Sequence, residues 1–289
     1  MRLHATISVK HGFSIYALRN DCVEVAAVPE LGARIISLKN VKTGREWMWR
    51  PPGKLKLFRN QSGDDFSRSP LVGMDECLPT IAPCRWRGRT LPDHGEVWSA
   101  PWKVDDQAWE RGELRASTAL KISPFDFDRT IQLRGGEISI AYQLRNRGVK
   151  EEHFLWALHP LLKMRRGDRL MLPKSSRALL NGEAWNEELN AVMPDGNCGK
   201  LFVSPLVDGG AGIHNQITGD RFDLEWCPVE NDTLGLWLTR GGWHGHHHFA
   251  IEPSNGDADT LNEAVARKRC GVVKPGGSAT WHVRFCIGP

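Results

Sequence analysis

Two polar residues stand immediately before a proline in segments that are otherwise apolar. His159 precedes Pro160 in "FLWALHPLL", and Glu252 precedes Pro253 in "FAIEPSNG". A residue before proline is held extended and proline donates no ladder hydrogen bond, so we expect each polar side chain at a strand end or bulge. A carboxylate and an imidazole on one sheet face could remove one proton while delivering another. The alternative is that both are ordinary strand-end polar groups.

A second polar cluster lies in "LPDHGEVWSAPW", residues 91–102. A loop accounts for the proline and the glycine, and a core strand accounts for the tryptophans. Neither accounts for the side chains of Asp93, His94 and Glu96 between them. We therefore interpret this segment as one wall of a binding site, in which Trp98 could stack on a sugar ring or pack in the core.

The run "WHGHHHF" places histidines at positions 244, 246, 247 and 248. Imidazole is a usual nitrogen ligand of zinc, but zinc sites normally gather their ligands from separate elements. Strand alternation would direct His246 and His248 away from His247. We therefore expect adventitious nickel binding by this run rather than a native metal site.

The elements that must position these residues show a period of two. In "FDFDRTIQLR" and "EISIAYQLRN" apolar and polar residues alternate, and Gly135 and Gly136 between them predict a two-residue hairpin turn with positive φ. The same period upstream at 114–120 predicts an antiparallel meander. Counted in this way, Ala157 shares a face with His159 and Ala250 shares a face with Glu252, and these small neighbours leave room for a ligand.

Many further strand-like runs are separated by Gly, Pro, Asn and Asp clusters; they are "CVEVAAV", "ARIISL", "HFLWALHPLL", "KLFVSPLV", "RFDLEW", "LGLWLT", "HHFAIEP" and "ATWHVRFCI". Such a pattern predicts an all-β fold, a large antiparallel sandwich, and no linker divides residues 1–289 into more than one domain. A short helix is expected at "TLNEAVARK", where Thr260 and Glu263 have the spacing of a capping box. The loop-rich stretch 54–73 is a candidate rim of a site.

Composition excludes several partners. The net charge is +4 and both signs are interspersed, so nucleic acid is not expected, while a sugar or another small solute suits the chain. No apolar run has the roughly 20 residues of a membrane helix, and the N-terminus lacks an apolar signal segment, so we expect a cytoplasmic protein without membrane attachment. The seven cysteines form no CxxC pair, and we expect reduced thiols.

Several segments, in this order, resemble the aldose 1-epimerase, or galactose mutarotase-like, superfamily; they are "VPELGARIISLKNVKTGREWMW", "GMDECLPTIAP", "GRTLPDHGEVWSAPW", "LWALHPLL", "IEPSNGDADTLNEA" and "GVVKPGGSATWHVRF". The resemblance covers about residues 23–286. It implies a β-sandwich of mutarotase type with one or two short helices and a sugar cleft. It also implies that Glu252 is the general base, that His159 is the general acid, and that His94 contacts the sugar.

These roles define a mechanism as a hypothesis. Glu252 takes the proton of the anomeric hydroxyl while protonated His159 gives a proton to the ring oxygen; the ring opens, the C1–C2 bond turns, and closure from the other face reverses both transfers. No metal or organic cofactor is required. The mechanism needs a charged Glu252 near a charged His159, and mutual attraction would favour both charged states.

The chain departs from the superfamily pattern in one respect. The best-studied galactose mutarotases carry an "NRI"-type segment whose arginine binds the sugar, and "SRSPLVGMDECLPT" occupies the comparable region here. Arg85 or Arg89 in "CRWRGRTLPD" could replace that arginine. Asp75 and Glu76 could accept hydrogen bonds from sugar hydroxyls or could brace the loop backbone. Asn255 is a further candidate for a sugar contact.

Three alternatives to a mutarotase stay open. An epimerase for phosphorylated or acidic sugars would need a basic pocket, which Arg85, Arg87 and Arg89 make conceivable. A non-catalytic carbohydrate-binding protein would keep the cleft without catalysed anomer exchange. A hydrolase or lyase could use the same sandwich, because fold does not fix reaction. A homodimer is also compatible with the sequence.

Overall fold

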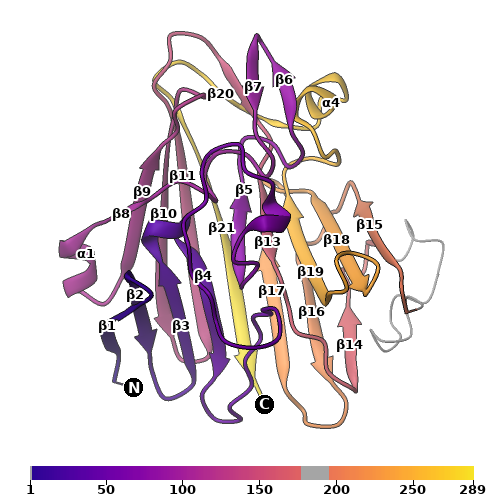
Figure 1. Ribbon diagram of the computed structural model, residues 1–289. Coiled ribbons are helices and arrows are strands. Elements are labelled where there is room, and N and C mark those ends of the chain that lie inside the picture. Colours follow the sequence, from indigo (N-terminus) through magenta and orange to yellow (C-terminus); the bar gives the residue numbers. More distant parts are fainter. Residues whose placement is uncertain (1, 177–194) are drawn as a thin grey trace.

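Two large antiparallel sheets pack face to face in the computed structural model, which describes residues 2–176 and 195–289. In Figure 1 the nine-stranded sheet lies in front of the eight-stranded sheet. In spatial order the first sheet contains β1 (His4–Lys10), β2 (Phe13–Arg19), β3 (Val23–Val28), β4 (Arg34–Asn40), β5 (Met74–Cys77), β13 (Ala157–Pro160), β19 (His247–Ser254), β18 (Thr233–Arg240) and β15 (Cys198–Val203).

The second sheet contains β14 (Asp168–Met171), β16 (Gly210–Asn215), β17 (Arg221–Trp226), β21 (Ser278–Gly288), β11 (Glu137–Asn146), β10 (Phe125–Arg134), β9 (Leu114–Ala119) and β8 (Lys103–Val104). Two two-stranded sheets are also present: β12 (Glu152–Phe154) pairs with β20 (Gly271–Val273), and β6 (Cys84–Trp86) forms a hairpin with β7 (Arg89–Leu91). The short helices are α1 (Asp106–Glu110), α4 (Leu261–Ala266) and the 3-10 turns η1 (Pro29–Leu31) and η2 (Phe66–Arg68). The predicted all-β antiparallel sandwich is confirmed.

The β10–β11 hairpin forms as the alternation predicts. Arg134 pairs with Glu137, so Gly135 and Gly136 are its two turn residues. Gly135 has φ +60°, but Gly136 does not have the positive φ that we expected. A Cβ on Gly136 would lie 2.6 Å from the carbonyl oxygen of Ile287, so close packing against β21, rather than backbone conformation, requires a glycine there.

The core lies between the two sheets and is rich in aromatic rings. Tyr142 and Trp281 are stacked with their ring centroids 5.5 Å apart, and Phe127 stacks against both rings, at 5.8 Å from Tyr142 and 5.9 Å from Trp281. Leu158 of β13 and Ile251 of β19 belong to the same core. Because side chains alternate along a strand, the neighbouring residues of β13 and β19 point to the other face of the nine-stranded sheet, away from the core.

Two local predictions need correction. The run at 153–162 is not one strand: β12 and β13 separate at Leu155, whose backbone N–H donates to Pro79 rather than to a ladder partner. Helix α4 is present, but the capping box is not, because the Thr260 side chain makes no capping hydrogen bond. Within the described residues, none of the helices is long and apolar enough to cross a membrane.

Candidate active site

His159 and Glu252 lie opposite each other on neighbouring strands. β13 and β19 pair at Ala157 with Ser254, and the isolated bridge between Leu162 and Phe249 keeps the same antiparallel register. That register puts position 159 opposite position 252. His159 Nε2 and Glu252 Oε1 are 3.9 Å apart. The two candidate catalytic residues, 93 positions apart in the sequence, therefore form one cross-strand pair.

The prolines that follow these two residues stand at hydrogen-bonding positions of the β13–β19 ladder. In the shared register the backbone groups of 158 and 160 face those of 253 and 251, the positions where ladder hydrogen bonds would form, and neither Pro160 nor Pro253 can donate one. The 159–252 pair falls between them, at a non-hydrogen-bonded position where side chains approach most closely. Opposite Glu252 on β18 stands Gly235, where a Cβ would lie 3.0 Å from Glu252 Oε2. Gly235 leaves the carboxylate room to lie over the sheet.

The pair lies in a cavity of about 220 Å³ on the face of the nine-stranded sheet that points away from the core. This volume is below the roughly 300–1,000 Å³ of sites for drug-sized ligands, so the cavity suits a small molecule. Its walls combine aromatic and aliphatic groups with a few polar ones: Phe66, Ile81, Ala82, Asp93, His94, His159, Leu161, Lys200, Trp237, Trp243, His248, Glu252 and Asp259.

The segment 91–102 forms one wall of this cavity through Asp93 and His94. His94 has φ +55°, and its Nδ1 lies 2.9 Å from Asp93 Oδ1. The ring of His94 stacks on Phe66 at a centroid distance of 4.0 Å, and Asp93 Oδ2 accepts the Phe66 backbone N–H. Gly95 is required because a Cβ there would lie 2.0 Å from the Leu78 carbonyl oxygen. The turn thus fixes an imidazole beside His159, at a ring-centroid distance of 5.0 Å.

Glu96 has a structural task instead. Its carboxylate oxygens accept the backbone N–H groups of Lys121, Ile122 and Ser123 at 2.7–3.0 Å. Trp98 is buried, donates its Nε1–H to the Asp93 carbonyl oxygen, and packs edge-on against Phe66. Trp98 therefore supports the cavity wall from behind and does not line the cavity.

Lys200 is the site residue that sequence reasoning missed most clearly. Its Nζ lies 3.4 Å from Glu252 Oε2 and 2.8 Å from Asp259 Oδ1. Burial opposes the positive charge, but the two carboxylates outweigh it and raise the pKa of Lys200 above its ordinary value. The alternation of Lys200 and Phe202 in "KLFV" was the available signal, since it puts a lysine and a phenylalanine on one strand face.

The electrostatics of His159 differ from the expectation. Burial lowers the pKa of His159 well below its usual value, and the neighbouring His94 and the positive charge of Lys200 lower it further. We expected Glu252 to hold His159 in its charged form. Lys200 instead provides the charge partner of Glu252, so His159 is a neutral imidazole at neutral pH.

The histidine run contributes one residue to the cavity. His248 is buried, and its Nε2 accepts a hydrogen bond from Trp237 Nε1 at 3.2 Å. Burial, with the nearby His246 and His247, lowers the pKa of His248 to about 3. His248 is therefore a neutral part of the cavity wall, beside Trp49 at a ring-centroid distance of 4.4 Å.

The other candidate residues lie outside the cavity. Asp75 is fully buried beside Arg34, whose Nε is 2.9 Å from Asp75 Oδ1. Glu76, the next residue, points into the core and accepts from Arg129 and Tyr142. Neither carboxylate lines the cavity, and both instead hold buried arginine side chains.

Asn255 and the two arginines also serve contacts elsewhere. Asn255 Oδ1 accepts the Trp156 backbone N–H at 2.7 Å and thereby holds β13 near the end of β19. Arg89 pairs with Glu152 at 2.6 Å on the β6–β7 hairpin, which lies with α4 at one end of the sandwich (Figure 1). Arg85 is exposed on the same hairpin. The structure does not bring these three residues to the cavity.

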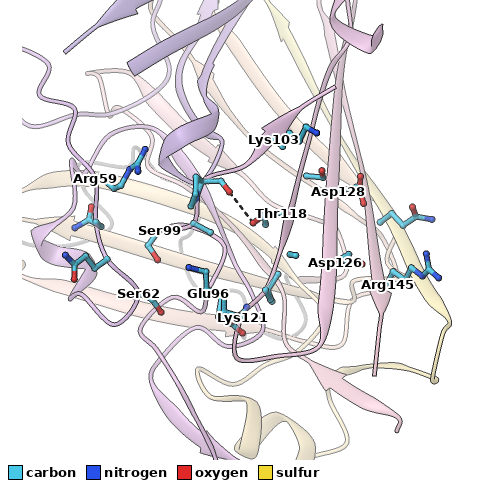
Figure 2. A pocket seen from close by; sticks show the side chains of 18 residues that line it. Arg59, Ser62, Glu96, Ser99, Lys103, Thr118, Lys121, Asp126, Asp128 and Arg145 are labelled. Carbon is cyan, nitrogen blue, oxygen red and sulfur yellow. Dashed lines mark hydrogen bonds between the residues drawn. The ribbon is translucent and has the colours of Figure 1, made fainter. Parts of the chain in front are cut away.

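A larger cavity of about 840 Å³ lies on the outer face of the second sheet, against the loop that contains Arg59 and Ser62 (Figure 2). Its acids are already engaged: Asp126 pairs with Arg147, and Asp128 pairs with Arg115. It contains no histidine. The smaller cavity is therefore the candidate active site.

The fold is that of the galactose mutarotase-like proteins, a large two-sheet antiparallel sandwich. The chain is similar in structure to the Slr1438 protein of Synechocystis sp. PCC 6803, with a TM-score of 0.74, 18% identity and 95% of each chain covered. It is also similar to a proposed aldose 1-epimerase of Klebsiella pneumoniae, with a TM-score of 0.75, 16% identity, and 99% and 83% of the two chains covered.

A third similar structure is a galactose mutarotase-like protein of Clostridium acetobutylicum, with a TM-score of 0.70, 15% identity, and 99% and 98% of the two chains covered. No family model matches the sequence. No curated protein matches it either. At these identities the likeness establishes the fold, and the reaction must be argued from the site.

Proposed function

We propose that the protein is a cofactor-independent isomerase that interconverts the anomers of a small sugar. The observation that carries this proposal is the His159–Glu252 pair, 3.9 Å apart in a cavity of about 220 Å³. The similarity in fold to a proposed aldose 1-epimerase supports it. The cavity suits one sugar ring, with the aromatic rings of Trp237 and Trp243 available to its apolar faces.

The catalytic residues act as follows. Glu252, held by Lys200, removes the proton of the anomeric hydroxyl, and protonated His159 delivers a proton to the ring oxygen. The ring opens, the C1–C2 bond turns, and closure returns both protons. Because the pKa of His159 is lowered, the productive form is a minority at neutral pH, but its proton is given up readily. We therefore expect kcat/KM to rise as the pH falls from 8 to 6.

A neutral sugar fits this cavity better than a phosphorylated one. Among the described residues that line it, Lys200 is the one lysine or arginine, and Glu252 and Asp259 already neutralise its charge. Arg87 donates to the backbone carbonyl oxygen of Glu151 and Arg89 donates to the Glu152 carboxylate, and neither arginine lines the cavity. A dianionic phosphate would therefore meet two carboxylates without a free cation to balance it.

The test is saturation-exchange NMR of the anomeric protons of glucose, galactose, 6-deoxy sugars, uronic acids and sugar phosphates. Wild type should accelerate exchange above the buffer rate for at least one neutral sugar, and Glu252→Gln should lose about 10²–10⁴-fold of that acceleration. Glu110→Gln, an exposed carboxylate at the end of α1, is the matched control and should keep full activity.

Three outcomes contradict the proposal. Sugar binding without acceleration on any sugar would indicate a carbohydrate-binding protein. Exchange that is retained in Glu252→Gln would exclude Glu252 as the base. Cleavage products in the same spectra would indicate a hydrolase or lyase on this fold.

A further inference from the structure

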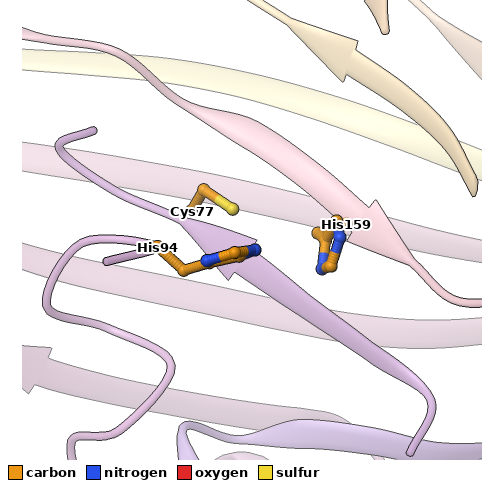
Figure 3. A group of neighbouring side chains, drawn as sticks. All are labelled: Cys77, His94 and His159. Atoms are coloured by element: carbon orange, nitrogen blue, oxygen red, sulfur yellow. The ribbon is translucent and has the colours of Figure 1, made fainter. Parts of the chain in front are cut away.

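Three side chains with metal-ligand atoms converge at the floor of the cavity. The ligand atoms of Cys77, His94 and His159 all lie within 4.8 Å of one another. Figure 3 shows Cys77 on β5 and His159 on β13, with the imidazole of His94 reaching between them from its turn. Cys77 pairs with Ala157 in the β5–β13 ladder and therefore points to the same sheet face as His159.

His94 is arranged as a metal-binding histidine is. Its Nδ1 donates to the Asp93 carboxylate, which can only accept, so Nε2 keeps a free lone pair that points away from Asp93. A carboxylate on the far nitrogen is the usual partner that orients a metal-ligating imidazole. Stacking on Phe66 fixes the ring plane as well.

The other two side chains have unused ligand atoms. His159 is 8% exposed, and its Nδ1 is buried without a hydrogen-bond partner among the described residues. Cys77 is 1% exposed and is one of the free cysteines. A buried imidazole nitrogen without a partner is costly, so it indicates a group that the site is built to hold.

We propose that Cys77, His94 and His159 form a binding site for a zinc-class divalent ion, with the fourth position open to the cavity. One thiolate and two imidazoles suit zinc, and three protein ligands with one open position are typical of accessible zinc sites. Zinc bond lengths put one sulfur and two nitrogens about 3.3–3.6 Å apart in a tetrahedron, so the three groups must close by up to about 1.5 Å. On binding, the Cys77 thiol loses its proton to solvent and its sulfur lone pair forms the metal bond.

Metal binding would also control the reaction. An ion at this position occupies the imidazole of His159 and the lone pair of His94, so the proton donor and one cavity wall are both lost to a sugar. Metal should therefore inhibit anomer exchange, and a chelator should restore it. This consequence rests on the proposed function, whereas the metal site itself does not.

Cobalt(II) is the probe, because it reports its ligands spectroscopically. The experiment uses untagged protein with the whole given sequence, in which His244→Gln and His247→Gln remove the two exposed histidines of the run 244–248, the cluster most able to bind metal adventitiously. One equivalent of Co²⁺ should produce tetrahedral visible bands and a near-ultraviolet sulfur-to-cobalt charge-transfer band. Cys77→Ser should abolish that band, and the matched variant Cys198→Ser, an exposed cysteine, should keep it.

A further variant separates a built site from incidental contact. Asp93→Asn should weaken Co²⁺ binding by about 10–100-fold, because the carboxylate orients His94. Absence of the charge-transfer band, its survival in Cys77→Ser, or its loss in Cys198→Ser would overturn the proposal. Co²⁺ binding by a protein without sugar-exchange activity would leave the metal site standing and reject the proposed function. Exchange that is unaffected by one equivalent of bound metal would reject the inhibitory role.

Discussion

Two buried carboxylates on the same sheet, Glu76 and Glu252, have opposite surroundings. Glu76 is fully buried in the core, where its Oε1 accepts from Arg129 at 2.7 Å and from Tyr142 at 3.1 Å. Glu252 is 2% exposed and faces the cavity, with Lys200 at 3.4 Å and His159 at 3.9 Å. The first carboxylate is held by short hydrogen bonds, whereas the second is held by a counter-charge that leaves its oxygens accessible.

This difference separates a stabilising charge from a reactive one. A carboxylate that is held by short hydrogen bonds is a structural support, and removing it leaves a buried cation behind. A carboxylate that lines a cavity, with oxygens that are not occupied by short hydrogen bonds, can accept a proton from a ligand. We therefore expect substitutions at Glu76 to change folding and substitutions around Glu252 to change activity.

The largest effect is expected for Glu76→Gln. The change leaves Arg129, 1% exposed, as an uncompensated buried charge and should lower the free energy of unfolding by about 3–5 kcal/mol. Urea unfolding followed by tryptophan fluorescence measures it, with Glu252→Gln as the matched carboxylate variant. Lys200 keeps Asp259 as a partner there, so Glu252→Gln should stay within about 1 kcal/mol of wild type. Equal losses in both variants would remove the distinction.

The second effect is expected for Lys200→Met. Without the ammonium, ionised Glu252 loses its counter-charge, and kcat/KM should fall by about 10-fold or more, in line with 1.4 kcal/mol of lost interaction. The pKa of His159, which the Lys200 charge helps to lower, should rise. Anomer exchange against pH measures the first effect, and NMR titration of the histidine ring protons measures the second.

Two lysine variants serve as controls for that prediction. Lys200→Arg keeps the charge and should recover part of the activity and the low pKa of His159. Lys103→Met, an exposed lysine on β8, should change neither. An unchanged pKa of His159 in Lys200→Met would show that Lys200 does not set the electrostatics of the site.

The sequence predicts the individual strands but not the register between strands that are distant in the sequence. Alternation predicted β10 and β11, and the two residue–proline pairs predicted that His159 and Glu252 lie at strand ends or bulges. The register of β13 against β19 joins segments about 90 residues apart, and no local pattern reports it. Lys200 was missed for that reason: its distance from Glu252 depends on the register of β15, β18 and β19 together.

Residue type alone predicted sugar contacts for several polar residues that the structure places against other protein groups. Asp75, Glu76 and Asn255 are sugar-binding types in a promising segment, but each one has a buried internal partner. Arg89 is likewise committed to Glu152. Whether a polar side chain faces a ligand or a protein partner depends on packing between elements, which spacing in the sequence does not contain.

Protonation of His248 should lower the free energy of unfolding at acidic pH. His248 has a pKa of about 3 in the fold against about 6.5 when unfolded, so between these values only the unfolded chain binds the proton. The free energy of unfolding therefore decreases as the pH falls through this window, by up to about 1.4 kcal/mol per pH unit for this residue. Asp75, whose pKa burial raises to about 6, acts in the opposite direction between about pH 4 and 6.

A comparison of wild type with His248→Gln isolates the histidine, because both proteins retain Asp75. Glutamine can still accept the Trp237 Nε1–H, so stability at pH 8 should stay close to that of wild type. Its decrease between pH 6 and 4 should be smaller by about 1–2 kcal/mol. Urea unfolding at several pH values measures this, and parallel pH profiles for the two proteins would contradict the assignment.

The smallest effect is expected for Gly235→Ala. The new methyl carbon would lie 3.0 Å from Glu252 Oε2 and 3.1 Å from Glu252 Cβ, so the carboxylate must shift by a few tenths of an ångström. The free energy of unfolding should change by less than about 1 kcal/mol, while a displaced base should lower kcat several-fold with little change in KM. Gly210→Ala, whose new methyl carbon would lie 3.9 Å from the Leu224 carbonyl oxygen in the second sheet, is the matched control and should keep full activity. Loss of stability without loss of kcat would show that Gly235 serves packing and not the position of Glu252.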